Sequence, residues 1–430
     1  MGQTTGIILG VANNIVLARL LGPANFGIYK IFLKICNVAG VLSQLGTNAV
    51  IVKLAGITAG TGDFGRLKGI LHSTFRIIII SSSVIVLIIY TNAQILASKV
   101  FHSPELYTIL LIGVVVIPLQ NGLLLTKEAF RGLQDLKTAS YLPVLQQLIL
   151  LILMLFLYFR LIASIENVLF ALSISIFCAL AVGLFALRRI TSQYLTKQVS
   201  PVSILQESLP MMITRGSLLV ITSMDVFVLG IYTNSTEVGI YSVVSALAAT
   251  TIFPLGTINQ VIPAMIAHLN VQKDFNTLSY LVRFASTLGA LFSIPFLILL
   301  IYFGKDFLYI LFGPQYTSGI IAFNFLIIGQ LVNCITGSCD NVLQMTGLHM
   351  VLMKISIICG LFNLVLNIYL VQHFGKEGVA AATALSLIAQ NVLATIMAYK
   401  KTGILTLASI NITGDIFKQA RRYISTLLSH

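Results

Sequence analysis

The stretch from Asn167 to Leu187 reads NVLFALSISIFCALAVGLFAL and holds no charged residue. At about 1.5 Å of rise per residue, a helix of this length crosses the ~30 Å hydrocarbon core of a bilayer. Runs of the same kind recur along the whole chain, in which 57% of residues are hydrophobic and only 9% are charged. A soluble domain carries about 25% charged residues, because its surface faces water. The sequence therefore predicts an all-α, polytopic membrane protein.

Apolar windows of this kind predict twelve membrane spans, and none of the segments between them is long enough for a soluble catalytic domain. The second and eighth spans are long enough to tilt or to extend past the bilayer. The predicted spans cover residues 3–21, 26–52, 76–96, 106–126, 140–159, 167–187, 209–231, 238–266, 278–302, 317–341, 352–372 and 377–399.

The basic residues predict the orientation of these spans. Of the 26 Lys and Arg residues, 18 fall in the loops and tail on the side of the two termini, and four fall in the opposite loops. Cytoplasmic loops of membrane proteins carry the excess of Lys and Arg. We therefore expect a multi-pass protein of the cytoplasmic membrane with both termini in the cytoplasm. The net charge of +13 follows from this rule, so no nucleic-acid partner is expected.

The two halves of the chain resemble each other in sequence. Phe26-Gly27-Ile28-Tyr29 recurs 212 residues later as Val238-Gly239-Ile240-Tyr241, at the start of the second and eighth spans. Shorter matches place Asp63-Phe64 against Asp274-Phe275, Ile89-Tyr90 against Ile301-Tyr302, and Gly132-Leu133 against Gly347-Leu348. A duplicated six-helix unit with an even number of spans gives parallel repeats related by a pseudo-twofold axis along the membrane normal. We expect six-helix lobes at 1–200 and 201–400, and a basic cytoplasmic tail at 401–430.

Motifs typical of enzymes give no catalytic site. Gly60–Gly65 fits GxGxxG, but it follows a membrane span where a dinucleotide fold needs a strand, so we interpret it as a flexible cytoplasmic loop. The six histidines are scattered, and the five cysteines lie in apolar segments without a CxxC pair. A membrane-embedded glycan polymerase or ligase is the enzymatic alternative, but such enzymes need polar groups on a sizeable external loop. We therefore expect a protein that is not an enzyme and has no cofactor.

Four basic residues lie within or at the edge of predicted spans, where an ionisable group is costly unless it serves a cavity or a partner. They are Arg19, Lys30, Lys34 and Arg215. Lys30 and Lys34 stand one helical turn apart on one face. The alternative is that these side chains extend to the membrane surface. We predict that the four line a basic cavity that binds a phosphate or diphosphate, to which a guanidinium donates in a bidentate manner.

Asp225 is an acid in the middle of the seventh predicted span and needs a compensating positive charge. Oxygen-bearing partners recur at helical spacing in the last two spans, where Asn363 and Asn367 share one face and Val379 and Thr383 share another. With one carboxylate, such a set balances a single positive charge. We predict a site for Na⁺ or H⁺ as a coupling ion at these five residues.

Several motifs in order resemble the polysaccharide exporters of the MOP flippase superfamily. They are LARLLGPANFGIY from Leu17 to Tyr29, MDVFVLG from Met224 to Gly230, LFGPQY from Leu311 to Tyr316, and NLVLN from Asn363 with GKEGVAAAT from Gly375 to Thr383. The resemblance implies two six-helix lobes around a central cavity. It also implies a polyprenyl phosphate- or diphosphate-linked oligosaccharide as substrate, moved from the inner to the outer leaflet.

The resemblance further implies roles for single residues. In related lipid II flippases an arginine of the cavity stands at the position of Arg19, and some bind sodium through residues that match Asp225, Asn363, Asn367, the Val379 carbonyl and Thr383. Two departures are visible. The position of Asn367 can be a carboxylate in those relatives, and residues 241–247 lack an arginine that they carry, which disfavours lipid II itself as substrate. A multidrug/cation antiporter of the same superfamily is the other alternative, which the basic cavity disfavours.

The expected partners follow from this interpretation. They are a polyprenyl-linked saccharide, membrane lipids and the polymerase or glycosyltransferases of the same pathway, and the chain is expected to act as a monomer.

The predicted orientation is testable with reporter fusions. A reporter that is active only outside the cell should give a signal when fused near Asn234 and none when fused after Lys401. The reverse pattern would contradict the orientation that the basic residues predict.

Overall fold

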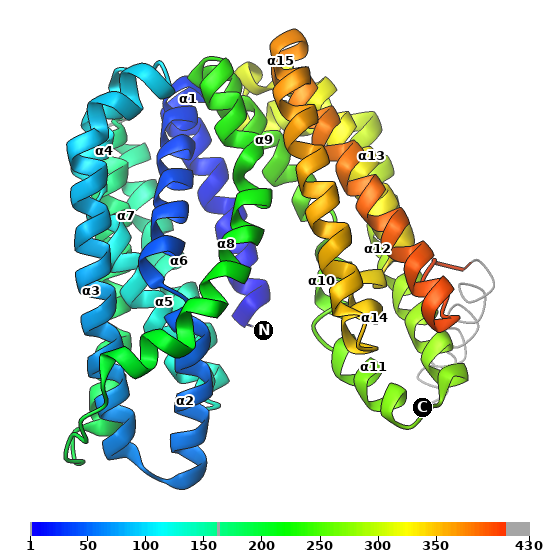
Figure 1. Cartoon of the computed structure of the whole chain (residues 1–430). Coiled ribbons are helices and arrows are strands. Elements are labelled where there is room, and N and C mark those ends of the chain that lie inside the picture. Colours follow the sequence, from blue (N-terminus) through cyan, green and yellow to red (C-terminus); the bar gives the residue numbers. More distant parts are fainter. Residues whose placement is uncertain (1, 161–163, 410–430) are drawn as a thin grey trace, which may run out of the picture. The chain divides into compact units, whose positions relative to one another are not determined.

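The computed structural model describes residues 2–160 and 164–409, and all regular secondary structure in them is helical (Figure 1). By their contacts the residues group into two compact units, Met1–Ile240 and Tyr241–His430, which are described separately. Helix α8 belongs to the first unit because it packs on α1 and α2. The lobe boundary at residue 200, which rests on the sequence repeat, stays a prediction.

The first unit contains eight complete helices and the first turns of α9. They are α1 Gly2–Gln44, α2 Thr47–Thr61, α3 Phe64–Ile95 with a π-helical extension Leu96–Val100, α4 Glu105–Gly113, α5 Val116–Gly132, α6 Leu136–Phe159, α7 Ile165–Thr191, α8 Pro201–Tyr232 and α9 Ser235–Thr250.

The second unit begins within α9 and ends with the longest helix. Its elements are α10 Phe253–Ile258, α11 Ile262–Val271, α12 Phe275–Phe312, a 3₁₀ turn Pro314–Gly319, α13 Ile320–Thr336, α14 Cys339–Met345 and α15 His349–Thr402. Its core packs α11, α12, α14 and α15 around fully buried side chains such as Ile266, Val282 and Val342.

The helices confirm an all-α, multi-pass membrane protein. In the described part of the chain, seven helices are long and apolar enough to cross a membrane, and the bent pair α4 and α5 forms an eighth. Helix α15 contains two predicted spans, and α1 contains one and most of a second. Helix α1 bends at Gly22 (φ 69°, ψ 171°) and α15 at Gly375 (φ 51°, ψ −130°), conformations that only glycine adopts without strain. The large side chains left exposed, such as Phe185 at 72%, suit a surface that faces lipid.

Four predicted spans are broken where the sequence pattern runs on. The second ends at Gln44 because Leu45 (φ 49°) and Gly46 (φ 77°) both turn left-handed before α2. The eighth is divided among α9, α10 and α11. The fourth bends by 45° between α4 and α5, and the tenth breaks at Gly337 (φ 67°) between α13 and α14. The second and eighth spans therefore look long in the sequence because each joins more than one helix. Hydropathy depends on composition and does not detect a change in backbone direction.

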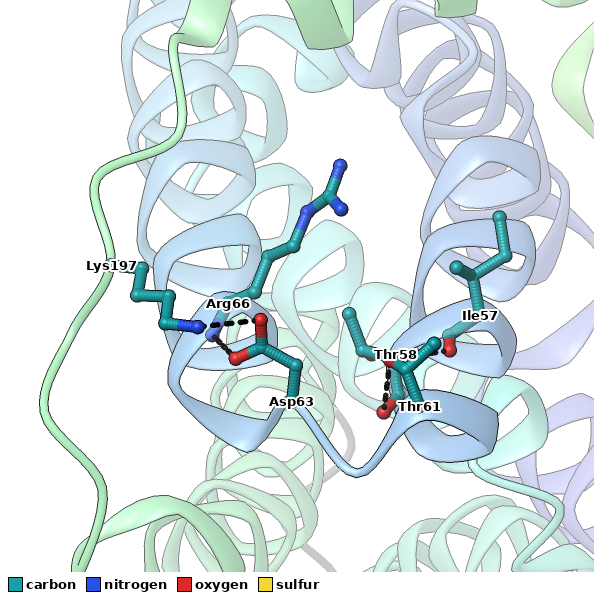
Figure 2. Close-up of polar contacts among 6 residues, drawn as sticks. All are labelled: Ile57, Thr58, Thr61, Asp63, Arg66 and Lys197. Carbon is teal, nitrogen blue, oxygen red and sulfur yellow. Dashed lines mark hydrogen bonds and ion pairs between the residues drawn. The ribbon is translucent and has the colours of Figure 1, made fainter.

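The stretch Gly60–Gly65 is not the loop that the sequence predicted, because its residues end α2 and begin α3 through a capped turn at Gly62 and Asp63 (Figure 2). Helix α2 ends at Thr61, Gly62 closes it in the left-handed conformation, and Asp63 accepts a hydrogen bond from the Arg66 amide at 3.0 Å to start α3. Lys197 pairs with Asp63 at 2.7 Å, and this hydrogen bond lowers the pKa of the Asp63 carboxyl. The turn uses the glycine for its backbone conformation and not for a nucleotide.

The backbone repeats together with the sequence. Asp274 starts α12 as Asp63 starts α3, by accepting a hydrogen bond from the Thr277 amide at 3.1 Å. Residues of positive φ also recur at nearly the same offset. Gly62 corresponds to Lys273, His102 to Gly313, and Gln134 to Gly347. This pairs Gly347 with Gln134, two residues beyond the Gly132 that the sequence match suggested. The duplicated unit is therefore visible in its turns.

The repeated glycines Gly27 and Gly239 meet each other where α1 crosses the start of α9. A Cβ at Gly27 would lie 1.7 Å from the Ser235 carbonyl oxygen, and one at Gly239 would lie 1.9 Å from the Pro23 carbonyl oxygen. Small residues at such crossings let the backbones of membrane helices approach. The repeat of this motif thus has a packing reason.

We predict that Gly27→Ala destabilises the protein by about 1–3 kcal/mol, because the added methyl group meets backbone that has no room to shift. Thermal unfolding in detergent measures the change. Gly60→Ala is the matched control: it also lies in a helix, but its Cβ meets nothing within 4 Å. It should leave stability unchanged or raise it by up to about 1 kcal/mol. Equal behaviour of the two variants would contradict the crossing as a packing constraint.

Candidate functional site

A polar cavity of the first unit has a volume of about 720 Å³. Both arms of α1 line it, together with α5, α6, α7 and Ser223 of α8. Its lining is rich in amide side chains: Asn13, Asn14, Asn37, Gln44, Gln120, Asn121, Gln146 and Gln147. A polar, roomy cavity in an apolar helical unit is filled with water unless a polar ligand occupies it.

Two lysines carry positive charge into this cavity. Lys30 and Lys34 stand one turn apart on the second arm of α1, and both line the cavity. The Lys30 ammonium donates to Asn14 Oδ1 at 2.7 Å and lies 4.8 Å from the centre of the Phe26 ring. The amide oxygen and the face of the ring both stabilise the positive charge of the ammonium group inside the helical unit. Among the described residues that line the cavity, none is acidic.

Two amide networks shape the cavity wall. Asn13 on the first arm of α1 donates to the carbonyl oxygen and to Oε1 of Gln147 on α6, at 2.9 and 2.8 Å. Its own Oδ1 is buried and accepts no hydrogen bond from the described residues. A buried acceptor without a donor is costly, so this oxygen is suited to a ligand's hydroxyl group or to a water.

The second network joins α1 to α5. Asn121 accepts a hydrogen bond from Gln44 Nε2 at 2.7 Å and donates to Ser43 Oγ at 2.6 Å and Ser82 Oγ at 3.1 Å. Asn48 donates in turn to Gln44 Oε1. These bonds hold the end of α1 against α5 and position the cavity-lining amides.

Sequence reasoning missed these amides because it searched for charge. A signal was present, since the adjacent polar pairs Asn13-Asn14, Gln120-Asn121 and Gln146-Gln147 each interrupt a predicted span. Polar groups at membrane depth face the interior of a helical bundle or a water-filled space.

The structure does not bring all four predicted basic residues together. Arg19 is exposed and is not among the residues that line the cavity, because it lies on another side of α1 just before the bend at Gly22. Arg215 belongs to α8, but its side chain lies outside the described residues.

The predicted cation ligands fall in both units. Asp225 is half-buried on α8 of the first unit, where its Oδ1 accepts a hydrogen bond from the Val226 amide at 2.8 Å. In the second unit, Asn367 Nδ2 donates to Asn363 Oδ1 at 2.9 Å, so this pair is brought together. Val379 is fully buried, and Thr383 Oγ1 lies 3.4 Å from the Tyr241 hydroxyl group.

The second-unit residues fit a hard monovalent cation in their chemistry. Asn367 is completely buried, and its Oδ1 has no hydrogen-bond partner among the described residues. Such an oxygen suits a cation ligand, because hard cations prefer oxygen. Among the described residues, no three His, Cys, Asp or Glu side chains cluster as for a divalent or transition metal.

Comparison with known protein families and proteins agrees with the motifs. Residues 1–270 match the family described as polysaccharide biosynthesis protein, and residues 210–369 match the MatE family. A probable low-salt glycan biosynthesis flippase of Haloferax volcanii is 25% identical over 45% of this chain and 43% of its own. A probable flippase of the same organism, AglR, is 28% identical over 46% of this chain and 41% of its own. These matches span less than half the length of each relative.

Solved structures share the fold. A multidrug resistance MATE transporter of the MOP superfamily, in an inward-facing conformation, superposes with a TM-score of 0.75 over 93% of this chain and 94% of its own, at 12% identity. The lipid II flippase MurJ, in an inward closed conformation, gives 0.72 over 93% and 88%, at 15% identity. These likenesses confirm the predicted fold class. Because the first family match alone covers more than half of the chain, the protein belongs to the polysaccharide biosynthesis protein family, with the fold of the MOP superfamily.

Proposed function

We propose that this protein is a flippase that moves a lipid-linked saccharide from the inner to the outer leaflet of the cytoplasmic membrane for the synthesis of cell-surface polysaccharide. The carrier is a polyprenyl phosphate or diphosphate. Family membership and the relatives named as flippases support this proposal. The observation that carries it is the cavity of about 720 Å³ that places Lys30 and Lys34 among amide side chains inside an apolar helical unit.

The cavity has separate groups for the two parts of such a substrate. Ammonium groups of Lys30 and Lys34 attract the phosphate, and amides that both donate and accept hydrogen bonds suit the many hydroxyl groups of a saccharide. The buried Asn13 Oδ1, which lacks a donor among the described residues, adds an acceptor. A cationic drug would be repelled by the two lysines, so the antiporter alternative is disfavoured. Arg19 and Arg215 remain proposed phosphate ligands.

The remaining parts of the proposal follow from the sequence. Both termini lie in the cytoplasm, the protein works as a monomer, and the polymerase and glycosyltransferases of the same pathway act before and after it. The transport step itself forms and breaks no covalent bond, so the protein is not an enzyme.

Transport is further proposed to be coupled to a gradient of Na⁺ or H⁺. Asp225 supplies the negative charge, and Asn363, Asn367, Thr383 and the Val379 carbonyl supply neutral oxygens. A single monovalent cation bound there would link the conformational cycle to the ion gradient. The unsatisfied Asn367 Oδ1 supports this assignment.

We predict that the double variant Lys30→Gln, Lys34→Gln lowers the transport rate by roughly ten- to a hundredfold. This is the effect expected from losing one or more hydrogen bonds to a charged group. The measurement follows a labelled polyprenyl diphosphate saccharide in vesicles with the purified protein, by the accessibility of its sugar to an impermeant lectin. Arg19→Ala, assayed in parallel, tests whether a residue outside the cavity also contacts the substrate.

The matched control is Lys99→Gln, which removes an exposed lysine of the same unit outside the cavity. It should transport at the wild-type rate. Wild-type transport by the double lysine variant, at equal protein abundance, would remove the cavity from the transport path.

A second prediction concerns coupling. Imposed gradients of Na⁺ or H⁺ across the same vesicles should accelerate transport by the wild type, and Asp225→Asn should abolish that response, because the neutral amide no longer balances a cation. The Asn variant should keep any transport that needs no gradient. A wild type that responds to neither gradient, or an Asn variant that responds normally, would show that the coupling site lies elsewhere.

A further inference from the structure

A second pocket lies between the start of α3 and the end of α7. Its volume is about 410 Å³, and it shares no lining residue with the amide-rich cavity. Three basic side chains, Lys68, His72 and Arg188, line it together with an apolar wall that includes Phe75 and Leu184. The proposed transport function makes no use of this pocket.

No acidic residue compensates the charge of this pocket among the described residues that line it. Lys68 donates one hydrogen bond to the Tyr194 carbonyl oxygen at 3.1 Å, and an ammonium group has three donors. Asp63, the acid that starts α3, is paired with Lys197 at 2.7 Å (Figure 2). The pocket is therefore suited to an anion.

Its apolar wall continues from the charged end into the membrane. Lys68 and Phe75 are seven residues apart on α3, which corresponds to about 10 Å along the helix. The spans predicted from the sequence begin at Arg76 on α3 and end at Leu187 on α7, which predicts headgroup depth for the basic groups. Leu184 falls just inside the predicted span and is 39% exposed. A ligand that fills this pocket has an anionic end and an apolar end.

We propose that the pocket binds one anionic phospholipid from the adjacent leaflet. The phosphate lies among Lys68, His72 and Arg188, and the first part of an acyl chain lies along Phe75 and Leu184. Basic pockets between membrane helices at the bilayer surface bind such headgroups by the same charge complementarity. An inorganic phosphate would bind the basic side chains but would leave the apolar wall exposed to water.

The protein contains no tryptophan, so one introduced indole reports on this site alone. We would reconstitute the full-length Phe75→Trp variant in vesicles that contain either phosphatidylglycerol or phosphatidylcholine with brominated acyl chains. Bromine quenches indole fluorescence on contact. We expect brominated phosphatidylglycerol to quench at a mole fraction at least about fivefold lower than brominated phosphatidylcholine, since each basic residue contributes roughly that factor.

Adding Lys68→Gln or Arg188→Gln to this reporter should reduce the preference for the anionic lipid by roughly fivefold each. Arg189→Gln is the matched control, because Arg189 is the next residue on α7, is exposed and does not line the pocket. A reporter at the exposed Phe177→Trp, on the same helix but outside the pocket, should show no preference.

Three outcomes would overturn the proposal. The first is equal quenching of the Phe75→Trp reporter by both lipids. The second is an Arg189→Gln variant that loses as much preference as Arg188→Gln, which would indicate general attraction to a charged surface. The third is recovery of fluorescence with soluble glycerol phosphate, which would show that the site recognises phosphate without a lipid.

Discussion

The close approach of α1 and α9 at Gly27 and Gly239 is the constraint on which the arrangement of the first unit depends. Here each helix backbone occupies the space in which the other would carry a Cβ. Lys30 and Lys34 follow Gly27 on the next two turns of α1. The crossing therefore fixes the depth and rotation at which these lysines enter the cavity. A membrane helix gains nothing from a hydrophobic effect against lipid, so van der Waals contact at small residues positions it together with hydrogen bonds to neighbouring helices.

The bend at Gly22 has a related consequence for charge. It separates α1 into an arm that carries Asn13 and Asn14 and an arm that carries Lys30. The hydrogen bond from Lys30 to Asn14 joins the two arms, so the charge that the cavity needs also stabilises the bend. A lysine at this depth is costly in hydrocarbon, and the Asn14 amide oxygen and the Phe26 ring offset that cost together. The polar cavity and the bend in its first helix thus depend on each other.

Much of the fold could be predicted from the sequence, because whether a segment enters the membrane depends on the summed hydropathy of its residues. The duplicated unit was also predictable, and Asp63 and Asp274 start equivalent helices as their match suggested. The breaks were harder to predict. Leu45, His102, Gln134 and Lys273 adopt positive φ without being glycine, so nothing in their residue type marks them as turns. Their conformation is imposed by the helices that they connect.

An all-α membrane protein built from a repeated unit, with Lys30 and Lys34 on one face of a helix, is predictable from the amino-acid sequence. Those properties depend on residues near each other in the chain, through hydropathy and helical period. Which face meets a cavity depends on the packing of the folded chain. That packing places Lys30 beside Asn14, joins Asn13 to Gln147 of α6, and leaves Arg19 outside the lining. The reason is that the neighbours of a side chain across a bundle depend on bends and helix rotations set by packing, which no local pattern encodes.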